Sequence, residues 1–338
     1  MAVSFLVFAD LHHEPKVFPH DAKRFLDEII ARGINAKVSF MVQLGDFLHT
    51  PQENRALADV FAEAPIPAYN VFGNHDNDQE SYEYILDMYR LRNGYYYFDR
   101  EGYRFIVLDP NYSVVNGELV HYNPNQARSH NRGEIPPDQM SWLEETICGS
   151  PFPCVLFSHQ SLERTDGIKN RDEVWRIICR ANRSRKHAVI LCVNGHYHCD
   201  YCTFMNGVCC LDLNSSSYHW TDPANRLYPQ EVYDKFPISD HCIFYKNPLS
   251  AVVTLTGTDR ITVEGSGGEF LYPIDRDELF RLDQRRLSDL RVCTPFISDY
   301  SVDLNRQIVE KGRNPSAVNR QNIIEEIQYA ERFQKREI

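Results

Sequence analysis

Residues 3–12, VSFLVFADLH, show the pattern that decides the fold: a short apolar run that ends abruptly at two polar residues, Asp10 and His12. Short runs rich in Val, Ile, Leu and Phe are typical of buried strands. The pattern recurs, so we expect a sheet whose strands end at polar residues. The further apolar runs are 38–44, 68–72, 105–108, 154–157 and 188–193.

Helical patterns separate several of these runs, and the clearest covers 21–32, with Gly33 expected to end the helix. The other predicted helices are 54–63, 81–91, 138–147 and 172–181. Alternating strands and helices favour an α/β fold with a largely parallel sheet. After residue 200 the pattern changes, since 199–214 and 249–264 indicate β-hairpins. The later sheet is therefore predicted to be mixed or antiparallel.

The remaining segments bear on domain organisation. Residues 110–137 and 215–248 form two long connections, and connections of this length are usually functional or mobile. Residues 315–338 indicate a charged helix with an apolar stripe. With no internal repeat and no linker, we expect a catalytic domain over 1–265 and a C-terminal helical extension over 266–338 that packs on it.

Composition excludes several classes of protein. Hydrophobic residues make up 43% and charged residues 25%, as in an ordinary globular chain, and the net charge is −11. An acidic chain repels a phosphate backbone, which argues against a nucleic-acid polymer as partner. No apolar run approaches the roughly 20 residues that span a bilayer, and no signal-peptide pattern opens the chain. We expect a soluble, cytoplasmic protein with no membrane partner; its oligomeric state is not indicated.

The cysteines allow two readings. Ten in 338 residues are too sparse for a disulfide scaffold. Cys199 and Cys202, followed by Cys209 and Cys210, admit a structural zinc site. However, the intervening 205–207 reads as a hairpin turn and the spacing differs from that of zinc fingers, which favours buried free thiols.

Five strand ends carry residues of the metal-ligand type. In open α/β sheets, ligands bind outside the carboxyl ends of the strands, so groups far apart in sequence can meet there. Each motif alone is weak, but five in order, each after an apolar run, form a specific set. They are Asp10-x-His12, Gly45-Asp46, Gly73-Asn74-His75-Asp76, Ser158-His159 and Gly195-His196-x-His198.

The chemistry of these groups predicts two divalent metal ions. Imidazoles mixed with carboxylates suit Mn, Fe or Zn. Two ions need a bridging group, so one Asp must be shared, and two such ions can activate water and clamp a phosphoryl group. The candidate ligands are Asp10, His12, Asp46, Asn74, His159, His196 and His198.

These five motifs resemble those of the calcineurin-like metallophosphoesterases over roughly residues 3–215. The resemblance implies a four-layer α/β/β/α sandwich of two mixed sheets flanked by helices, with a dinuclear centre at one edge. It also implies that Asp46 bridges the ions, that His75 faces the substrate as a catalytic residue and that Asp76 orients it. The implied ligand sets are Asp10, His12, Asp46 and His198 for one ion, and Asp46, Asn74, His159 and His196 for the other.

Departures from particular subfamilies narrow the resemblance. Purple acid phosphatases have a Tyr three residues after the bridging Asp, where this chain has His49. The Gly-Asp-x-Val-Asp-Arg-Gly motif of protein Ser/Thr phosphatases is not retained at 45–49, and the chain lacks the length for the second domain of bacterial 5′-nucleotidases. The remaining pattern is most similar to small cytoplasmic phosphodiesterases.

The resemblance implies metal-dependent hydrolysis of a small phosphate ester, with a phosphodiester favoured and a bridging hydroxide as nucleophile. The alternatives are a phosphomonoesterase and an enzyme that cleaves a diphosphate link in a nucleotide derivative. A binding protein without catalysis is a further alternative, but it should have lost ligands that this chain retains.

Other polar residues are weaker candidates for contact with the substrate or for support of the ligands. His13 and His49 lie beside ligands in the sequence. Tyr218 and Trp220 could stack a nucleobase, but packing in the core is the alternative interpretation for both. The other candidates lie in loops, and their alternative interpretation is simple exposure to solvent. The candidate substrate contacts are His13, His49, Asn111, Tyr112 and Arg132.

Overall fold

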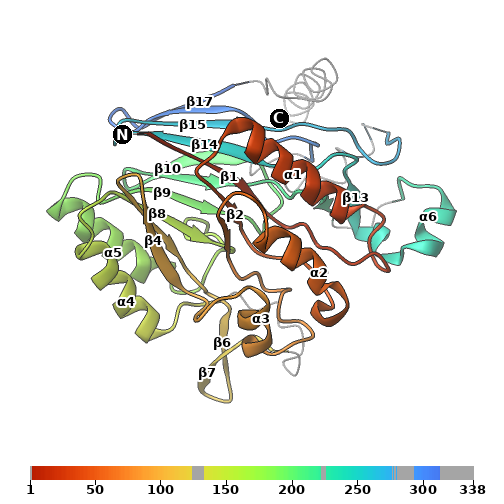
Figure 1. Cartoon of the computed structure of the whole chain (residues 1–338), viewed down its shortest axis with the longest axis horizontal. Coiled ribbons are helices and arrows are strands. Elements are labelled where there is room, and N and C mark those ends of the chain that lie inside the picture. The colour runs from red at the N-terminus through yellow and green to blue at the C-terminus, as the bar shows by residue number, and fades with distance from the viewer. Residues whose placement is uncertain are drawn as a thin grey trace.

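The computed structural model describes residues 2–123, 133–221, 226–275, 277, 279 and 293–312. Within these residues two large β-sheets pack face to face, and helices cover both outer faces (Figure 1). Both sheets contain parallel and antiparallel neighbours. The expected α/β/β/α sandwich of two mixed sheets is therefore confirmed.

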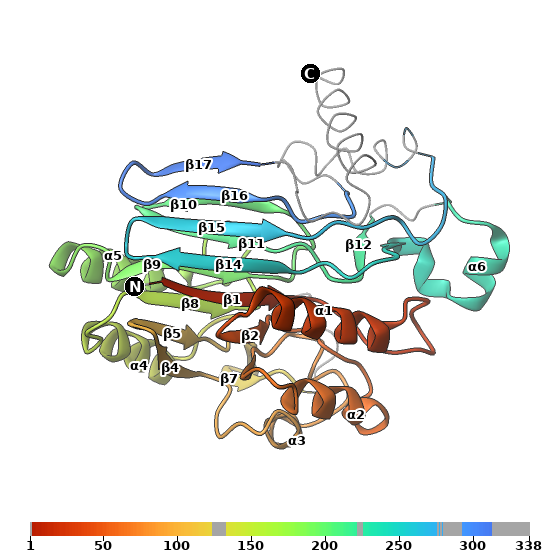
Figure 2. The ribbon, with the colours of Figure 1, turned by 45° about the horizontal axis from the view of Figure 1, so that its top comes forward.

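The first sheet has seven strands in the order β17-β16-β15-β14-β1-β2-β3 (Figure 2). The neighbours β1, β2 and β3 are parallel, and from β1 outward to β17 every pairing is antiparallel. The strands are β1 (Ala2–Phe8), β2 (Phe40–Gln43), β3 (Ala68–Asn70), β14 (Ala251–Thr256), β15 (Arg260–Gly265), β16 (Tyr300–Asp303) and β17 (Ile308–Lys311).

The second sheet has six strands in the order β10-β11-β9-β8-β5-β4. Its four central strands are parallel, and each edge strand is antiparallel to its neighbour. The strands are β4 (Tyr96–Arg100), β5 (Tyr103–Val107), β8 (Cys154–Ser158), β9 (Val189–Asn194), β10 (Tyr201–Met205) and β11 (Val208–Asp212). Two small antiparallel pairs lie outside it: β6 (Tyr112–Val115) with β7 (Glu118–His121), and β12 (Tyr218–Trp220) with β13 (Cys242–Phe244).

Each sheet has its own helical layer (Figure 1). Helices α1 (Ala22–Ala36), α2 (Pro51–Ala62) and α3 (Tyr82–Met88) cover the first sheet, and α4 (Pro137–Cys148) and α5 (Arg171–Ser184) cover the second. The short α6 (Gln230–Lys235) and the 3-10 helix η1 (Pro237–His241) pack near β12 and β13. None of the helices in the described ranges has the length and apolar character that a bilayer crossing requires.

Alternation along β1 builds two of the cores at once. Phe5 faces the second sheet, whereas Leu6 and Phe8 face the helices, because successive side chains of a strand point to opposite faces. The Phe5 ring stacks on Phe40 at 5.0 Å between centroids, and it meets the Phe105 ring of the second sheet edge-on at 5.5 Å. Phe5 therefore joins the two sheets.

All six predicted strands, all five predicted helices and both hairpins are present, with ends shifted by a few residues. The predicted stop at Gly33 is wrong, because α1 continues to Ala36 and ends at Lys37, whose φ is 55°. A Cβ on Gly33 would lie 3.0 Å from Sδ of Met41 on β2. This glycine allows the helix to pack closely on the sheet rather than ending it.

Four stretches contain strands that the sequence pattern did not indicate. Residues 92–104 include β4, residues 110–137 include the β6–β7 hairpin, and residues 215–248 include the paired strands β12 and β13. The described part of 266–338 includes β16 and β17, which extend the first sheet from β15. The helix expected over 315–338 lies outside the described residues. The division into a domain over 1–265 and an extension over 266–338 remains a prediction. All ten cysteines are free thiols.

We expect Phe5→Ala to lower the free energy of unfolding by about 3–5 kcal/mol, the usual cost of truncating a fully buried phenylalanine. Phe5→Leu should cost less because it leaves a smaller cavity. Chemical denaturation followed by circular dichroism measures both values. Equal stability of Phe5→Ala and the parent protein would contradict this account of the core.

Candidate metal centre

The polar residues that follow β1, β2, β3, β8 and β9 meet at one edge of the two sheets. Two groups form there, and each has ligand-type atoms within 4.8 Å of one another. The first group is Asp10, His12 and His198, and the second is Asp46, His159 and His196. The structure therefore brings these six predicted ligands together, and Asn74 joins the second group through His159.

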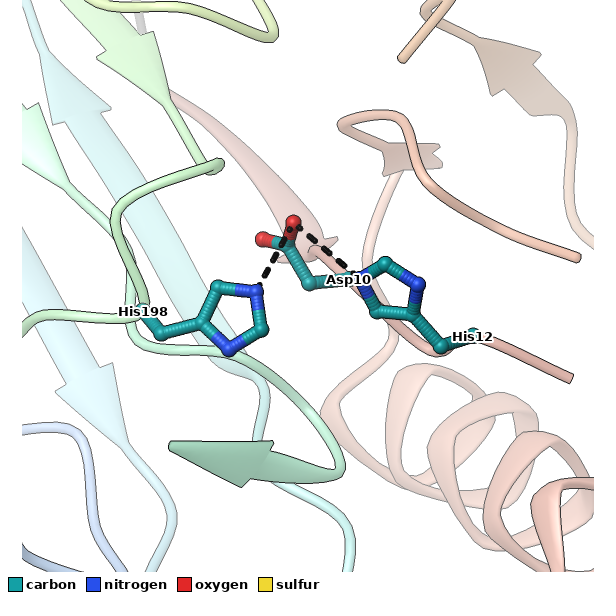
Figure 3. Close-up of side chains that lie close together, drawn as sticks. All are labelled: Asp10, His12 and His198. Carbon is teal, nitrogen blue, oxygen red and sulfur yellow. Dashed lines mark ion pairs between the residues drawn. The ribbon is translucent and has the colours of Figure 1, made fainter. Parts of the chain in front are cut away.

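In the first group, Oδ1 of Asp10 lies 3.4 Å from Nε2 of His198 and 3.9 Å from Nε2 of His12 (Figure 3). All three side chains are buried. Oδ1 of Asp10 and Nε2 of His12 have no hydrogen-bond partner within the described ranges. A buried polar atom without a partner is costly, so these two atoms fit a metal ion as their partner.

In the second group, Nε2 of His159 lies 3.1 Å from Oδ2 of Asp46, 3.2 Å from Nδ1 of His196 and 3.2 Å from Oδ1 of Asn74. Atoms bound at about 2.1 Å to one ion lie roughly 3 to 4 Å apart, so the spacing fits a common ion. Oδ2 of Asp46 is also 3.8 Å from Nε2 of His12. Asp46 thus reaches both groups.

Hydrogen bonds orient three of the four ligand-type histidines. In each, Nδ1 is engaged by another protein group, and Nε2 is left to face the centre. The bonds join Nδ1 of His12 to Nε2 of His49 at 2.8 Å, Nδ1 of His159 to the Leu44 carbonyl at 2.7 Å, and Nδ1 of His198 to the Tyr218 carbonyl at 2.7 Å. His196 instead presents Nδ1 to the centre.

The backbone at the centre is unusual. Asp10, His12, Asp46, His196 and His198 have φ values of 56°, 48°, 51°, 69° and 48°. Residues other than glycine seldom adopt this left-handed conformation, and such residues concentrate at functional sites. The strand-end loops thus turn sharply and direct these side chains toward one point.

Two glycines let the loops approach one another. A Cβ on Gly73 would lie 2.0 Å from the backbone nitrogen of Asp46, and a Cβ on Gly45 would lie 2.5 Å from Nδ1 of His159. Gly45 also has a φ of 99°. The glycines that precede Asp46 and Asn74 in the motifs are therefore required by close contact between the loops.

Electrostatics favour the metal-binding form of three ligand-type side chains, His12, His196 and Asp46, but not of His159. Burial lowers the pKa of His159, but the carboxylate of Asp46 outweighs burial and raises the pKa to about 9, so this ring must lose a proton to bind an ion. Burial lowers the pKa of His12 well below its usual value, and burial with the nearby His159 lowers the pKa of His196 to about 3. Both imidazoles are thus neutral. Burial raises the pKa of Asp46, but His159 and His75 outweigh it, so the pKa lies well below normal and the carboxylate stays ionised.

The carboxylate that holds the His75 ring is Asp78, which sequence reasoning missed. Nδ1 of His75 lies 2.6 Å from Oδ2 of Asp78. Asp76, expected to orient His75, instead accepts hydrogen bonds from the backbone nitrogens of Phe47 and Gly73 at 3.0 and 2.7 Å. The assignment of the orienting role to Asp76 is corrected accordingly. Burial lowers the pKa of His75, but the carboxylates of Asp46 and Asp78 outweigh it and raise the pKa to about 9.

The weaker candidates lie in different places. The His49 ring contacts His12, whereas His13 pairs through its backbone with the strand-end loop at Phe47. Asn111 is fully buried, and its side chain bonds to the Phe72 carbonyl, Asp109 and Gln160. Tyr112 lies half-buried on β6 with its ring near His121. Arg132 lies outside the described residues.

The family model for calcineurin-like phosphoesterases matches residues 3–200, so the chain belongs to this family. The family uses a dinuclear metal centre and hydrolyses phosphate esters, and the chain is a hydrolase of this kind. The resemblance found in the sequence is confirmed. A search of curated protein sequences gave no significant match.

Two solved structures share the fold at low sequence identity. A dimetal phosphatase from Danio rerio is 17% identical, with a TM-score of 0.55 over 80% of this chain and 98% of that chain. The structure of PhoD is 12% identical, with a TM-score of 0.53 over 99% of this chain and 78% of that chain. At these identities the comparison supports the architecture alone.

We expect Asp46→Asn to lower the metal content more than Asn74→Ala does, because Asp46 approaches both groups and Asn74 only one. Metal analysis by mass spectrometry after gel filtration measures the ratio of metal to protein, and circular dichroism controls for folding. Retention of two ions by Asp46→Asn would contradict the shared position of this carboxylate.

Proposed function

We propose that this protein hydrolyses a small phosphate ester, with a phosphodiester favoured, at a centre of two divalent ions. The observation that carries the proposal is the convergence of seven ligand-type side chains in two adjacent groups, in which two buried atoms, Oδ1 of Asp10 and Nε2 of His12, have no partner in the described structure. Asp46 would be shared by both ions. Asp10, His12 and His198 would complete one site, and Asn74, His159 and His196 the other.

Bound divalent ions would supply an activated water and a positively charged clamp for the phosphoryl oxygens. Imidazoles mixed with two carboxylates suit Mn, Fe or Zn. These ligands bring two negative charges against the four positive charges of the ions. A net positive centre can therefore receive a phosphate ester.

The charge of the surroundings favours a diester over a monoester. A monoester carries a second negative charge, and sites that bind it usually add Arg or Lys. In the described part of the chain, the cavity next to the centre contains a single such residue, Lys16, whose Nζ is bonded to Glu53. A singly charged diester makes a smaller demand on such a site.

In this proposal His75 would act on the departing oxygen. Its backbone nitrogen donates to Oδ1 of Asp46 at 2.8 Å, which fixes it at the edge of the centre, and its ring lines the adjacent cavity. Asp78 engages Nδ1, so Nε2 is left to face a substrate. A proton on Nε2 would stabilise negative charge on the phosphoryl group and pass to the leaving oxygen.

We also infer a cytoplasmic location. The ten free thiols, seven of them buried, suit a reducing compartment.

A substrate panel tests the proposal. With Mn added, we expect bis-p-nitrophenyl phosphate and small alkyl diesters to be hydrolysed faster than monoesters, cyclic nucleotides being assayed in parallel as one diester class. A chelator should abolish turnover, and Mn, Fe or Zn should restore it. A clear preference for a monoester or for a nucleotide diphosphate derivative would replace the diester assignment, and full activity without metal would reject the mechanism.

For His75→Ala, we expect normal metal content and a loss of kcat of about 10²–10⁴-fold on an alkyl ester, the usual range for general acid catalysis. The loss should be smaller on a nitrophenyl ester, because that leaving group needs no proton. Asp78→Asn keeps the His75 ring but removes its carboxylate partner. It should cause a smaller loss of kcat, again greater on the alkyl ester than on the nitrophenyl ester. Equal losses on both esters would reject the proton transfer and leave only charge stabilisation.

A further inference from the structure

A cavity of about 300 Å³ lies beside the metal centre, and His12, His49 and His75 form its inner end. The other lining residues come from the loops after β1 and β3, from the start of α2, and from β12 and η1. Those that matter here are Glu14, Lys16, Phe18, Glu53, Tyr218 and Trp220. His75 lies between the metal centre and this cavity. The alcohol part of an ester bound at the centre, on the side next to His75, would therefore occupy the cavity.

Aromatic rings form one wall of the cavity. Phe18 stacks against Tyr218 at 5.4 Å, and Tyr218 meets Trp220 edge-on at 5.1 Å between centroids. Tyr218 is fully buried, and its hydroxyl has no hydrogen-bond partner within the described ranges. Aromatic faces attract cations as well as apolar groups, and Trp220, which is only partly buried, presents its ring to the cavity beside Tyr218.

The charged groups of the cavity largely form pairs. Lys16 bonds to Glu53, and His75 bonds to Asp78. The remaining carboxylate, Glu14, accepts hydrogen bonds only from neutral groups in the described structure, among them Nδ2 of Asn54 at 3.0 Å and the backbone nitrogen of Lys16 at 3.2 Å.

These hydrogen bonds hold the Glu14 side chain in a fixed position. With 5% of its surface exposed, Glu14 is a fixed negative charge at the wall of the cavity. The described lining therefore offers one unpaired carboxylate and no unpaired cation.

We propose that this cavity binds the alcohol part of the ester and selects an alcohol that carries a positive charge, such as an amino alcohol. The aromatic wall receives the cationic group and Glu14 supplies the compensating charge. A second phosphate or a carboxylate in the same place would meet Glu14 without an available cation. The inference rests on the proposed function, since it concerns the substrate of the same centre.

Two isosteric diesters test the selection: the methyl phosphodiester of choline and that of 3,3-dimethylbutan-1-ol, which replaces the trimethylammonium group by tert-butyl. We expect kcat/KM to be about tenfold higher for the choline ester, the order expected for a desolvated cation–aromatic contact. The methyl diester of glycolic acid, which carries an anionic group, should be the poorest substrate. Release of the alcohol is followed by NMR.

Two variants should move the choline-to-dimethylbutyl ratio in opposite directions. Glu14→Gln removes the unpaired charge without changing the shape and should lower the ratio. Lys16→Met releases Glu53 from its ion pair and should raise the ratio, by less because both side chains are exposed to solvent. Lys16→Met also keeps the test decisive if Glu14→Gln does not fold.

A binding measurement separates this inference from the proposed function. Choline should change the tryptophan fluorescence of the metal-loaded protein at lower concentration than 3,3-dimethylbutan-1-ol does, and Trp220→Phe should remove that change. Hydrolysis of all three esters with no preference for the cation, or with a ratio insensitive to both variants, would overturn the inference alone. Failure to hydrolyse any ester with two metals bound would reject the proposed function, and this inference with it.

Discussion

Burial of two carboxylates at the ends of adjacent parallel strands is the constraint on which the site depends. Asp10 follows β1 and Asp46 follows β2, and at most 2% of either residue is exposed. Removing an ionised carboxylate from water costs several kcal/mol unless it is compensated. One oxygen of each therefore accepts a backbone hydrogen bond, Asp10 from His196 and Asp46 from His75. The other oxygen of each faces imidazoles.

Elements of the fold that depend on residues close together in the chain could be predicted from the sequence, and elements that depend on contacts between distant residues could not. The six strands of the apolar runs and the positions of the ligand-type residues could be predicted, because each apolar run and its polar end are neighbours in the chain. Strands β16 and β17 could not be predicted, because β16 pairs with β15, some 35 residues earlier, and β17 pairs in turn with β16. The β6–β7 hairpin was missed because its strands are short and partly exposed. Gly33 was misread because its role lies in contact with Met41, not in the helix itself.

Asp76 and Asp78 show how a turn redistributes roles among adjacent residues. Asp76 is next to His75 in sequence, but its carboxylate accepts hydrogen bonds from the backbone nitrogens of Phe47 and Gly73 instead of from the His75 ring. The turn closes with a hydrogen bond from the Asp78 nitrogen to the His75 carbonyl at 3.2 Å, which brings the Asp78 side chain beside the ring. Asp76 thus joins two ligand loops, and Asp78 takes the position beside the imidazole.

Contacts within the protein itself fix the positions of the ligand-type side chains at the centre. Hydrogen bonds fix the rings of His12, His159 and His198, and a left-handed backbone fixes the direction of Asp10 and Asp46. Such conformations cost of order 1–3 kcal/mol each and persist only where the surroundings enforce them. Since the strain and the buried charges are already part of the folded state, an ion meets ligands that need little rearrangement. Ions that bind only the folded chain then add to its stability. The left-handed backbone and the buried carboxylates therefore raise the free energy of the folded chain without metal, and they also favour the binding of an ion.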